Sequence, residues 1–245
     1  MIKSNEVKQL GGMQIILYHL LPGIPIFLLA IFFANPEYGL GMSIMLALML
    51  AALIGLIPFQ LLIIKLAANK EGKKFADMIL FTNKTARGKF FLFVFGAFVL
   101  AGAFFTLVNT IEQSFWINFT LYPDWLRTDK YTIEASNMAL LWLTVVMYFV
   151  FNGFLGPVVE ECYFRGFLLP RMNKLGKLAP LINTVLFSLY HFFSPWQILT
   201  RIFGFLPIAY ATWYTKNIRL SITVHCLLNL IGCFQIAMLV LQLYS

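Results

Sequence analysis

Apolar runs long enough to cross a bilayer alternate along this chain with short polar segments. A helix needs about 20 apolar residues to span the hydrocarbon core, and we identify seven candidate spans on that basis. They cover residues 15–34, 41–66, 90–111, 138–160, 179–194, 198–215 and 219–243. The pattern predicts an all-α fold, a polytopic membrane helical bundle with about seven transmembrane helices.

Two stretches leave the number of helices open. The fifth and sixth runs are short, and Ser194-Pro195 between them favours a break in the helix. An eighth helix could lie along the membrane surface over residues 70–81, with lysines toward water and apolar side chains toward lipid. Its two faces would carry Lys70, Lys73 and Lys74, and Phe75, Met78, Ile79 and Phe81, respectively.

The distribution of Lys and Arg predicts a cytoplasmic N-terminus. With that orientation, 15 of the 18 basic residues fall in inner segments, as the positive-inside rule requires. The three in outer segments are Arg127, Lys130 and Arg201. The outer loop, residues 112–137, carries aromatic side chains suited to the membrane interface, namely Trp116, Tyr122, Trp125 and Tyr131. The first run has no A-x-A cleavage site, so we expect it to remain as an uncleaved span.

Composition supports a membrane protein. Only 11% of the 245 residues are charged and 60% are hydrophobic, whereas soluble domains carry about 25% charged residues. We therefore expect one membrane domain, residues 1–245. The net charge of +8 is spread between apolar runs, which indicates cytoplasmic loops and no nucleic-acid partner. Cys162, Cys226 and Cys233 form no CxxC pair or disulfide framework, and we expect them to be small buried side chains.

The most costly polar residues in the spans are two adjacent glutamates, Glu160 and Glu161, which follow an uncharged run over residues 138–159. Ionisable groups at membrane depth are by default candidates for function. Glu161 and Arg165 are four residues apart on a helix and can form a structural pair, whereas Glu160 points about 100° away and has no such partner. In a simpler interpretation, Glu160 merely faces lipid headgroups. Gly156-Pro157 should kink the helix and open a recess for water.

The other polar residues at membrane depth lie mostly in the later spans. His191 is in the fifth span, and His225 and Asn229 share one face of the seventh because they are four residues apart. Each histidine alone is more simply a core residue bonded to a backbone carbonyl, but together with Glu160 they suggest a site. We expect His19, in the first span, to be structural. The polar groups expected at the outer end of the third span are Asn109, Glu112 and Gln113.

These side chains are sufficient to hydrolyse a peptide bond without a covalent intermediate. A glutamate with a histidine can hold and deprotonate a water molecule, and a second histidine with an asparagine can donate hydrogen bonds to the oxyanion. Zinc is the main alternative, because two histidines and a glutamate can bind it, although no HExxH occurs. Cys162 has no evident base, and Cys226 points to another face than its neighbour His225. Ser188 is expected to bond the preceding helical turn.

Three motifs in this region resemble those of a known family. They are EExxxR at residues 160–165, FxxxH at residues 187–191 and HxxxN at residues 225–229. In this order, and in a membrane, they resemble the CPBP family, which comprises the type II CAAX prenyl endopeptidases and bacteriocin-processing enzymes and is also called the Abi family. The resemblance covers residues 138–240, which would be the catalytic core, and residues 1–112 would be accessory spans. The family's weaker fourth motif is not recognisable.

The resemblance implies an intramembrane, glutamate-dependent endopeptidase that needs no metal or other cofactor. Members of the family cleave prenylated CAAX tails, process peptide precursors or confer immunity to bacteriocins. The implied partners are the lipid bilayer, expected to be a bacterial cell membrane, and a peptide or protein substrate in or at that membrane. The implied roles are Glu160 as general base, His191 as its partner in holding the water, His225 and Asn229 as the oxyanion site, and Glu161 and Arg165 as structural support.

Two other functions stay open at this point. One is a non-catalytic immunity factor or scaffold of the same fold, and the other is a transporter with an acidic proton relay, although no inverted repeat is present. Catalysis also sets a geometric condition, because Glu160 lies near the inner end of its span while His191 would lie about 18–20 Å deep. We predict that Glu160, His191, His225 and Asn229 converge on one cavity open to the cytoplasm, through tilt or a bend at Pro157.

Overall fold

The computed structural model describes residues 7–116, 123–126 and 138–242, and these residues are almost entirely helical. The α-helices are α1 (Gly12–Leu20), α2 (Gly23–Ala34), α3 (Ile44–Ala51), α4 (Ile57–Glu71), α5 (Arg87–Trp116), α6 (Met138–Met147), α7 (Gly156–Glu160), α8 (Ala179–Leu189), α9 (Ile198–Thr215) and α10 (Ile218–Gln242). The π-helical segments are η2 (Ala52–Leu56), η5 (Tyr148–Leu155) and η6 (Glu161–Leu168). The 3₁₀ segments are η3 (Phe75–Met78), η4 (Asp124–Leu126), η7 (Leu169–Leu178) and η8 (Pro195–Gln197). The all-α class is confirmed.

Five helical stretches among the described residues are long and apolar enough to cross a membrane. They are Gly12–Ala34, Ile44–Glu71, Arg87–Trp116, Met138–Leu189 and Ile218–Gln242. The chain is a multi-pass membrane protein, but the predicted number of seven spans is not confirmed. Helix α8 has 11 residues, about half of what a spanning helix needs. Helix α9 has 18 residues, and Pro207 lies inside it.

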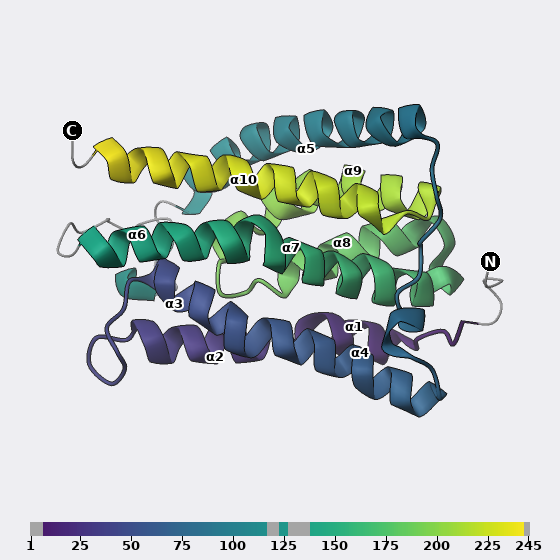
Figure 1. Cartoon of the computed structure of the whole chain (residues 1–245), viewed down its shortest axis with the longest axis horizontal. Coiled ribbons are helices and arrows are strands. Elements are labelled where there is room, and N and C mark those ends of the chain that lie inside the picture. Colours follow the sequence, from purple (N-terminus) through teal and green to yellow (C-terminus); the bar gives the residue numbers. More distant parts are fainter. Residues whose placement is uncertain (1–6, 117–122, 127–137, 243–245) are drawn as a thin grey trace.

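The helices lie side by side in an elongated bundle (Figure 1). Helix α10 runs along α6, η5 and α7, and α5 packs against α9 and α10. Aromatic side chains fill the centre, where Tyr163, Phe164 and Phe187 are fully buried. Exposed apolar side chains cover the outside of α5, among them Phe91, Leu92, Phe95, Leu107 and Ile111. A continuous apolar surface of this kind suits lipid and would promote aggregation in water.

The predicted surface helix over residues 70–81 is wrong. Helix α4 continues to Glu71 and ends there because Gly72 adopts a left-handed conformation with φ of 62°, a common way to terminate a helix. Only one 3₁₀ turn follows, over Phe75–Met78. Met78, which was expected to face lipid, is completely buried, and its carbonyl accepts a hydrogen bond from Arg171 at 3.1 Å. Met78 therefore anchors the segment to the bundle, while residues 72–77 before it stay exposed.

The predicted end of the fourth span at residue 160 is also wrong. The helix continues through η6 for eight more residues, to Leu168. Arg165 was counted among the basic residues of an inner segment, but it is fully buried beside Glu161. Because the charge is paired inside the bundle, it does not stop the helix. The glutamates consequently lie well inside the helix, and the depth difference expected between Glu160 and His191 disappears.

Several connecting segments meet at one end of the bundle. There the Leu80 N–H donates to the Gly166 carbonyl at 2.9 Å, and the Ile218 N–H donates to the Phe81 carbonyl at 2.8 Å. Basic residues in these connections or at the adjoining helix ends include Lys70, Lys73, Lys74, Lys84, Arg87, Lys216 and Arg219. Such clustering agrees with a cytoplasmic end, and the orientation stays a prediction. Of the residues named for the outer loop, Tyr122, Arg127, Lys130 and Tyr131 lie outside the described part of the chain.

Candidate active site

Glu160 is the last residue of α7 and lies between two π-helical segments. The residue is only 8% exposed. Its Oε1 atom accepts a hydrogen bond from the Tyr190 hydroxyl and lies 3.9 Å from Nε2 of His191. Its Oε2 atom lies 3.8 Å from Nε2 of His225. The carboxylate therefore faces two imidazoles at distances longer than a direct hydrogen bond.

His191 does not lie within the fifth helix, as predicted, because α8 ends at Leu189 and the chain turns there. Its Nδ1 atom lies 2.9 Å from the Phe187 carbonyl oxygen. A carbonyl can only accept a hydrogen bond, so Nδ1 carries the proton and the neutral ring presents the Nε2 lone pair to Glu160. The FxxxH spacing thus has a direct structural use: the backbone of the first residue sets the tautomer of the last.

His225, on α10, lies between the two glutamates. Its Nδ1 atom is 2.9 Å from Oε1 of Glu161, while its Nε2 atom faces Glu160. A carboxylate accepts hydrogen bonds, so Nδ1 donates and the ring is held in one orientation. Glu161 is consequently more than a partner for Arg165, because it also positions an imidazole against Glu160.

The expected ion pair between Glu161 and Arg165 is present. The Arg165 Nη1 atom lies 3.2 Å from Glu161 Oε1, and both side chains are fully buried. The guanidinium also lies over the Phe187 ring at 4.0 Å and near the Phe205 ring at 5.5 Å. These rings supply an apolar but electron-rich environment for the cation. The pair binds η6 to the aromatic core, directly after Glu160.

Asn229 is placed differently from the other predicted site residues. It lies one helical turn beyond His225 on α10. Its Nδ2 atom donates a hydrogen bond to the Asn152 backbone carbonyl at 2.8 Å. The structure thus brings Glu160, His191 and His225 together and directs the Asn229 amide toward the neighbouring helix. The predicted part of Asn229 in an oxyanion site stays a prediction.

The distances around Glu160 suit a bridging, hydrogen-bonded water. Two heavy atoms 3.8 or 3.9 Å apart can share a water placed to one side, because each hydrogen bond spans about 2.7–3.0 Å. The carboxylate and a neutral Nε2 atom are both acceptors, and a water offers two hydrogens. Glu160 and His191 can therefore orient one water between them.

Tyr190 belongs to the site and was not predicted from the sequence. It is fully buried, its ring stacks on Phe164 with centroids 4.9 Å apart, and its hydroxyl donates to Glu160. In the sequence it is one of several aromatic residues in the stretch 187–193. The only signal was its place directly before His191 in the FxxxH motif, which does not distinguish a core tyrosine from a site tyrosine.

Glu112 is a second buried carboxylate with a different environment. Its two oxygens accept hydrogen bonds from the backbone N–H groups of Leu199 and Thr200, each at 2.8 Å. Next to it, the Gln113 amide donates to the Trp196 carbonyl at 3.2 Å. These residues were expected to be polar groups at the end of their own helix. Instead they anchor the N-terminus of α9, where a negative charge is favourable.

Two further polar residues have structural partners. The fully buried His19 has Nδ1 2.7 Å from the Ile15 carbonyl oxygen and Nε2 3.0 Å from the Asn183 amide, so it lies apart from Glu160 in its contacts. The Ser188 hydroxyl was expected to bond the preceding turn, but it donates to the Ile198 carbonyl at 2.7 Å. This bond fastens the end of α8, three residues before His191, to the start of α9.

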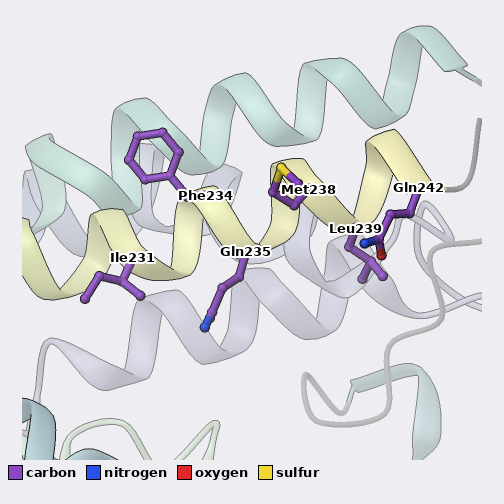
Figure 2. A pocket seen from close by; sticks show the side chains of 6 residues that line it. All are labelled: Ile231, Phe234, Gln235, Met238, Leu239 and Gln242. Atoms are coloured by element: carbon purple, nitrogen blue, oxygen red, sulfur yellow. The ribbon is translucent and has the colours of Figure 1, made fainter. Parts of the chain in front are cut away.

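A surface hollow lies at the other end of α10, beyond His225. Figure 2 shows its lining, which comes entirely from that helix: Ile231, Phe234, Gln235, Met238, Leu239 and Gln242. None of these side chains can ionise, so the hollow is not the site of the acid–base chemistry. Across residues 7–116, 123–126 and 138–242, no group of three or more His, Cys, Asp and Glu side chains is arranged to hold a metal ion.

The fold and the cluster define a multi-pass membrane protein with a buried carboxylate facing two imidazoles. Residues 141–231 match the family model described as Type II CAAX prenyl endopeptidase Rce1-like, and the matched segment contains all three motifs. The match supports the expected resemblance: over this segment the chain is similar to the CPBP and CAAX protease family. No curated protein and no solved structure matches the chain.

Proposed function

We propose that this protein is an intramembrane endopeptidase that hydrolyses a peptide bond with a water activated by Glu160. The observation that carries this proposal is the environment of Glu160. The carboxylate is buried, it lies within 4 Å of two histidine nitrogens, and neither contact is a direct hydrogen bond. A general base needs this combination, since it must reach a water and still be free to take its proton.

The proposed reaction begins with a water held between Glu160 and Nε2 of His191. As the water oxygen attacks the peptide carbonyl, Glu160 takes one of its protons, and negative charge develops on the former carbonyl oxygen. The imidazolium form of His225, whose Nδ1–H is held by Glu161, can donate from Nε2 to that oxyanion. When the tetrahedral intermediate breaks, Glu160 returns its proton to the leaving amine. No covalent enzyme intermediate and no metal takes part.

The family suggests the class of substrate. We infer that the substrate is a membrane-associated peptide or protein, with a prenylated CAAX tail as the first candidate and a peptide precursor as the second. In this proposal residues 138–240 are the catalytic core, residues 1–112 are accessory spans, and the protein lies in a bacterial cell membrane with its N-terminus in the cytoplasm. Asn229 contributes to the site from α10.

The test uses the full chain reconstituted in liposomes and an internally quenched peptide that ends in a farnesylated CAAX sequence. We expect cleavage by the parent protein and none above background by Glu160→Gln, since an amide cannot accept the proton of water. Thermal unfolding of both proteins shows whether the variant is folded. Cleavage that survives in folded Glu160→Gln would refute the assigned base. A parent protein that cleaves neither this peptide nor its unprenylated form would favour the non-catalytic immunity or scaffold function.

A further inference from the structure

The helix that carries Glu160 has an unusual hydrogen-bond register just before the glutamate. Segment η5 is π-helical, so each N–H donates to the carbonyl five residues earlier. The last bond of this kind runs from the Gly156 N–H to the Phe151 carbonyl. A Cβ atom on residue 156 would lie 2.7 Å from that carbonyl oxygen, so only glycine allows this close approach.

Pro157 ends the π-helical register and leaves one carbonyl without its donor. In the π register the Asn152 carbonyl would accept from residue 157, but proline has no N–H. In the α register it would accept from Gly156, whose N–H is already used by Phe151. The Asn152 carbonyl therefore lacks a donor within its own helix. Unsatisfied backbone groups are especially costly at membrane depth, where no bulk water can replace the missing partner.

The side chain of Asn229 supplies the missing donor from α10. Its Nδ2 atom lies 2.8 Å from the Asn152 carbonyl oxygen. Because His225 is one turn earlier on the same helix and contacts both glutamates, α10 is fastened to the Glu160 helix on both sides of Pro157. The two contacts therefore lie on either side of the break in the hydrogen-bond register at Pro157, three residues before the proposed base.

We propose that Asn229 is a positioning residue that closes the gap left by Pro157 and so holds Glu160 against the two histidines. The effect on turnover rests on the proposed function, whereas the effect on stability does not. The proposal makes a specific prediction: the importance of Asn229 depends on the identity of residue 157. If residue 157 has an N–H, the Asn152 carbonyl regains a donor within its own helix, and the side chain at 229 becomes dispensable.

A double-mutant cycle between Asn229→Ala and Pro157→Ala tests this dependence, because coupled residues show non-additive effects. Asn229→Ala should lower the Tm by about 5 °C in the parent, the size expected for one lost buried hydrogen bond in a chain of this length. It should also lower kcat about tenfold with little change in KM, since the base is displaced and the bound substrate is not. In the Pro157→Ala background both losses should shrink to less than half.

Cys233→Ala is the matched control. Cys233 is one turn beyond Asn229 on α10, and its thiol lies 3.7 Å from the Tyr148 carbonyl oxygen, also in η5. Proline does not interrupt the register at Tyr148, because its π-helical donor is the N–H of Gly153. The effect of Cys233→Ala on Tm and kcat should therefore be the same with Pro or Ala at position 157.

The outcomes separate cleanly. Equal Tm losses for Asn229→Ala in both backgrounds would overturn the proposal. Recovery of Tm without recovery of kcat would also overturn it, in favour of direct contact between Asn229 and the reacting carbonyl.

If the parent has no peptidase activity, the proposed function fails and the Tm cycle alone decides. If Pro157→Ala does not fold, Asn229→Asp is measured in the parent background instead. An aspartate side chain has no N–H to donate, so retention of the parent Tm would contradict the assigned bond.

Discussion

Two buried carboxylates of this protein, Glu112 and Glu160, have opposite surroundings. Both oxygens of Glu112 accept backbone N–H groups at 2.8 Å, so its hydrogen-bonding capacity is occupied by the start of α9. Glu160 has one hydroxyl donor, from Tyr190, and two histidine nitrogens at 3.8 and 3.9 Å. Burial alone is similar at the two sites, with 3% and 8% of each residue exposed. What differs is whether the carboxylate still has an acceptor position free for water.

The difference in hydrogen-bond partners indicates whether a buried carboxylate has a structural or a catalytic role. A carboxylate satisfied by fixed backbone donors gains stability and loses the freedom to take up a proton, because protonation would break those bonds. Glu161 differs from both: its Oε1 atom pairs with Arg165 and accepts a hydrogen bond from His225. Glu160 alone keeps loosely held partners that can exchange protons. Variants of these residues should therefore separate into losses of activity and losses of stability.

The largest effect is expected from Glu160→Gln. Removal of a general base typically lowers the rate by about 10²–10⁴-fold, and the farnesylated peptide assay should show a loss of that order. The variant should keep the parent Tm within about 2 °C, since no strong bond is lost. A rate unchanged per folded molecule would remove Glu160 from the mechanism.

Glu161→Gln and Arg165→Ala should act mainly on folding. Each leaves one member of a fully buried ion pair without its partner, and breaking such a pair by removal of one side costs about 3–5 kcal/mol. We expect low yields of folded protein, measured by size-exclusion chromatography and thermal unfolding in detergent. Normal Tm values for both variants would show that the pair does not hold η6 in place.

Glu112→Gln should be destabilising without a direct effect on catalysis. The amide keeps one acceptor oxygen but cannot satisfy both N–H groups at the start of α9, and a hydrogen bond to a charged group contributes about 1.5–3 kcal/mol. The Tm should fall, while kcat per folded molecule stays near that of the parent. A selective loss of kcat at the parent Tm would contradict the structural role of Glu112.

Tyr190→Phe should have a smaller effect on the reaction and little effect on the fold. Loss of the hydroxyl frees the Glu160 carboxylate to rotate, and we expect kcat to fall about tenfold, equivalent to about 1.4 kcal/mol, with KM unchanged. Tyr163→Phe is the matched control, because that buried hydroxyl donates to the Tyr18 carbonyl and does not contact Glu160. Equal behaviour of the two variants would show that the Tyr190 hydroxyl has no special part.

The smallest effect is expected from removal of metals and thiols. Cleavage should be unchanged after treatment with a chelator and in a variant with alanine at all three cysteines. Rates are measured on the same reconstituted protein before and after treatment. Activity lost to the chelator and restored by zinc would establish a metalloprotease, and loss in the cysteine-free variant would implicate a thiol.

The sequence was sufficient for part of this picture because that part depends on local spacing. The four-residue spacing of Glu161 and Arg165, and the family motifs, were visible without coordinates. The extension of the helix beyond Glu160 was not, because a buried Arg165 resembles a membrane-edge residue unless its aromatic surroundings are known. Two contacts depend on the register between helices distant in the sequence: Tyr190 with Glu160, and Asn229 with Asn152. The π-helical stretch before Pro157 sets that register in part.

The most direct test of the account is a paired measurement of Glu160→Gln and Glu112→Gln in one preparation series. For each variant, the cleavage rate per folded molecule and the Tm are determined together. Opposite results are expected: Glu160→Gln keeps the parent Tm and loses cleavage, and Glu112→Gln has a lower Tm and keeps cleavage. A folded Glu160→Gln protein that still cleaves the peptide would contradict the central claim that Glu160 activates the water.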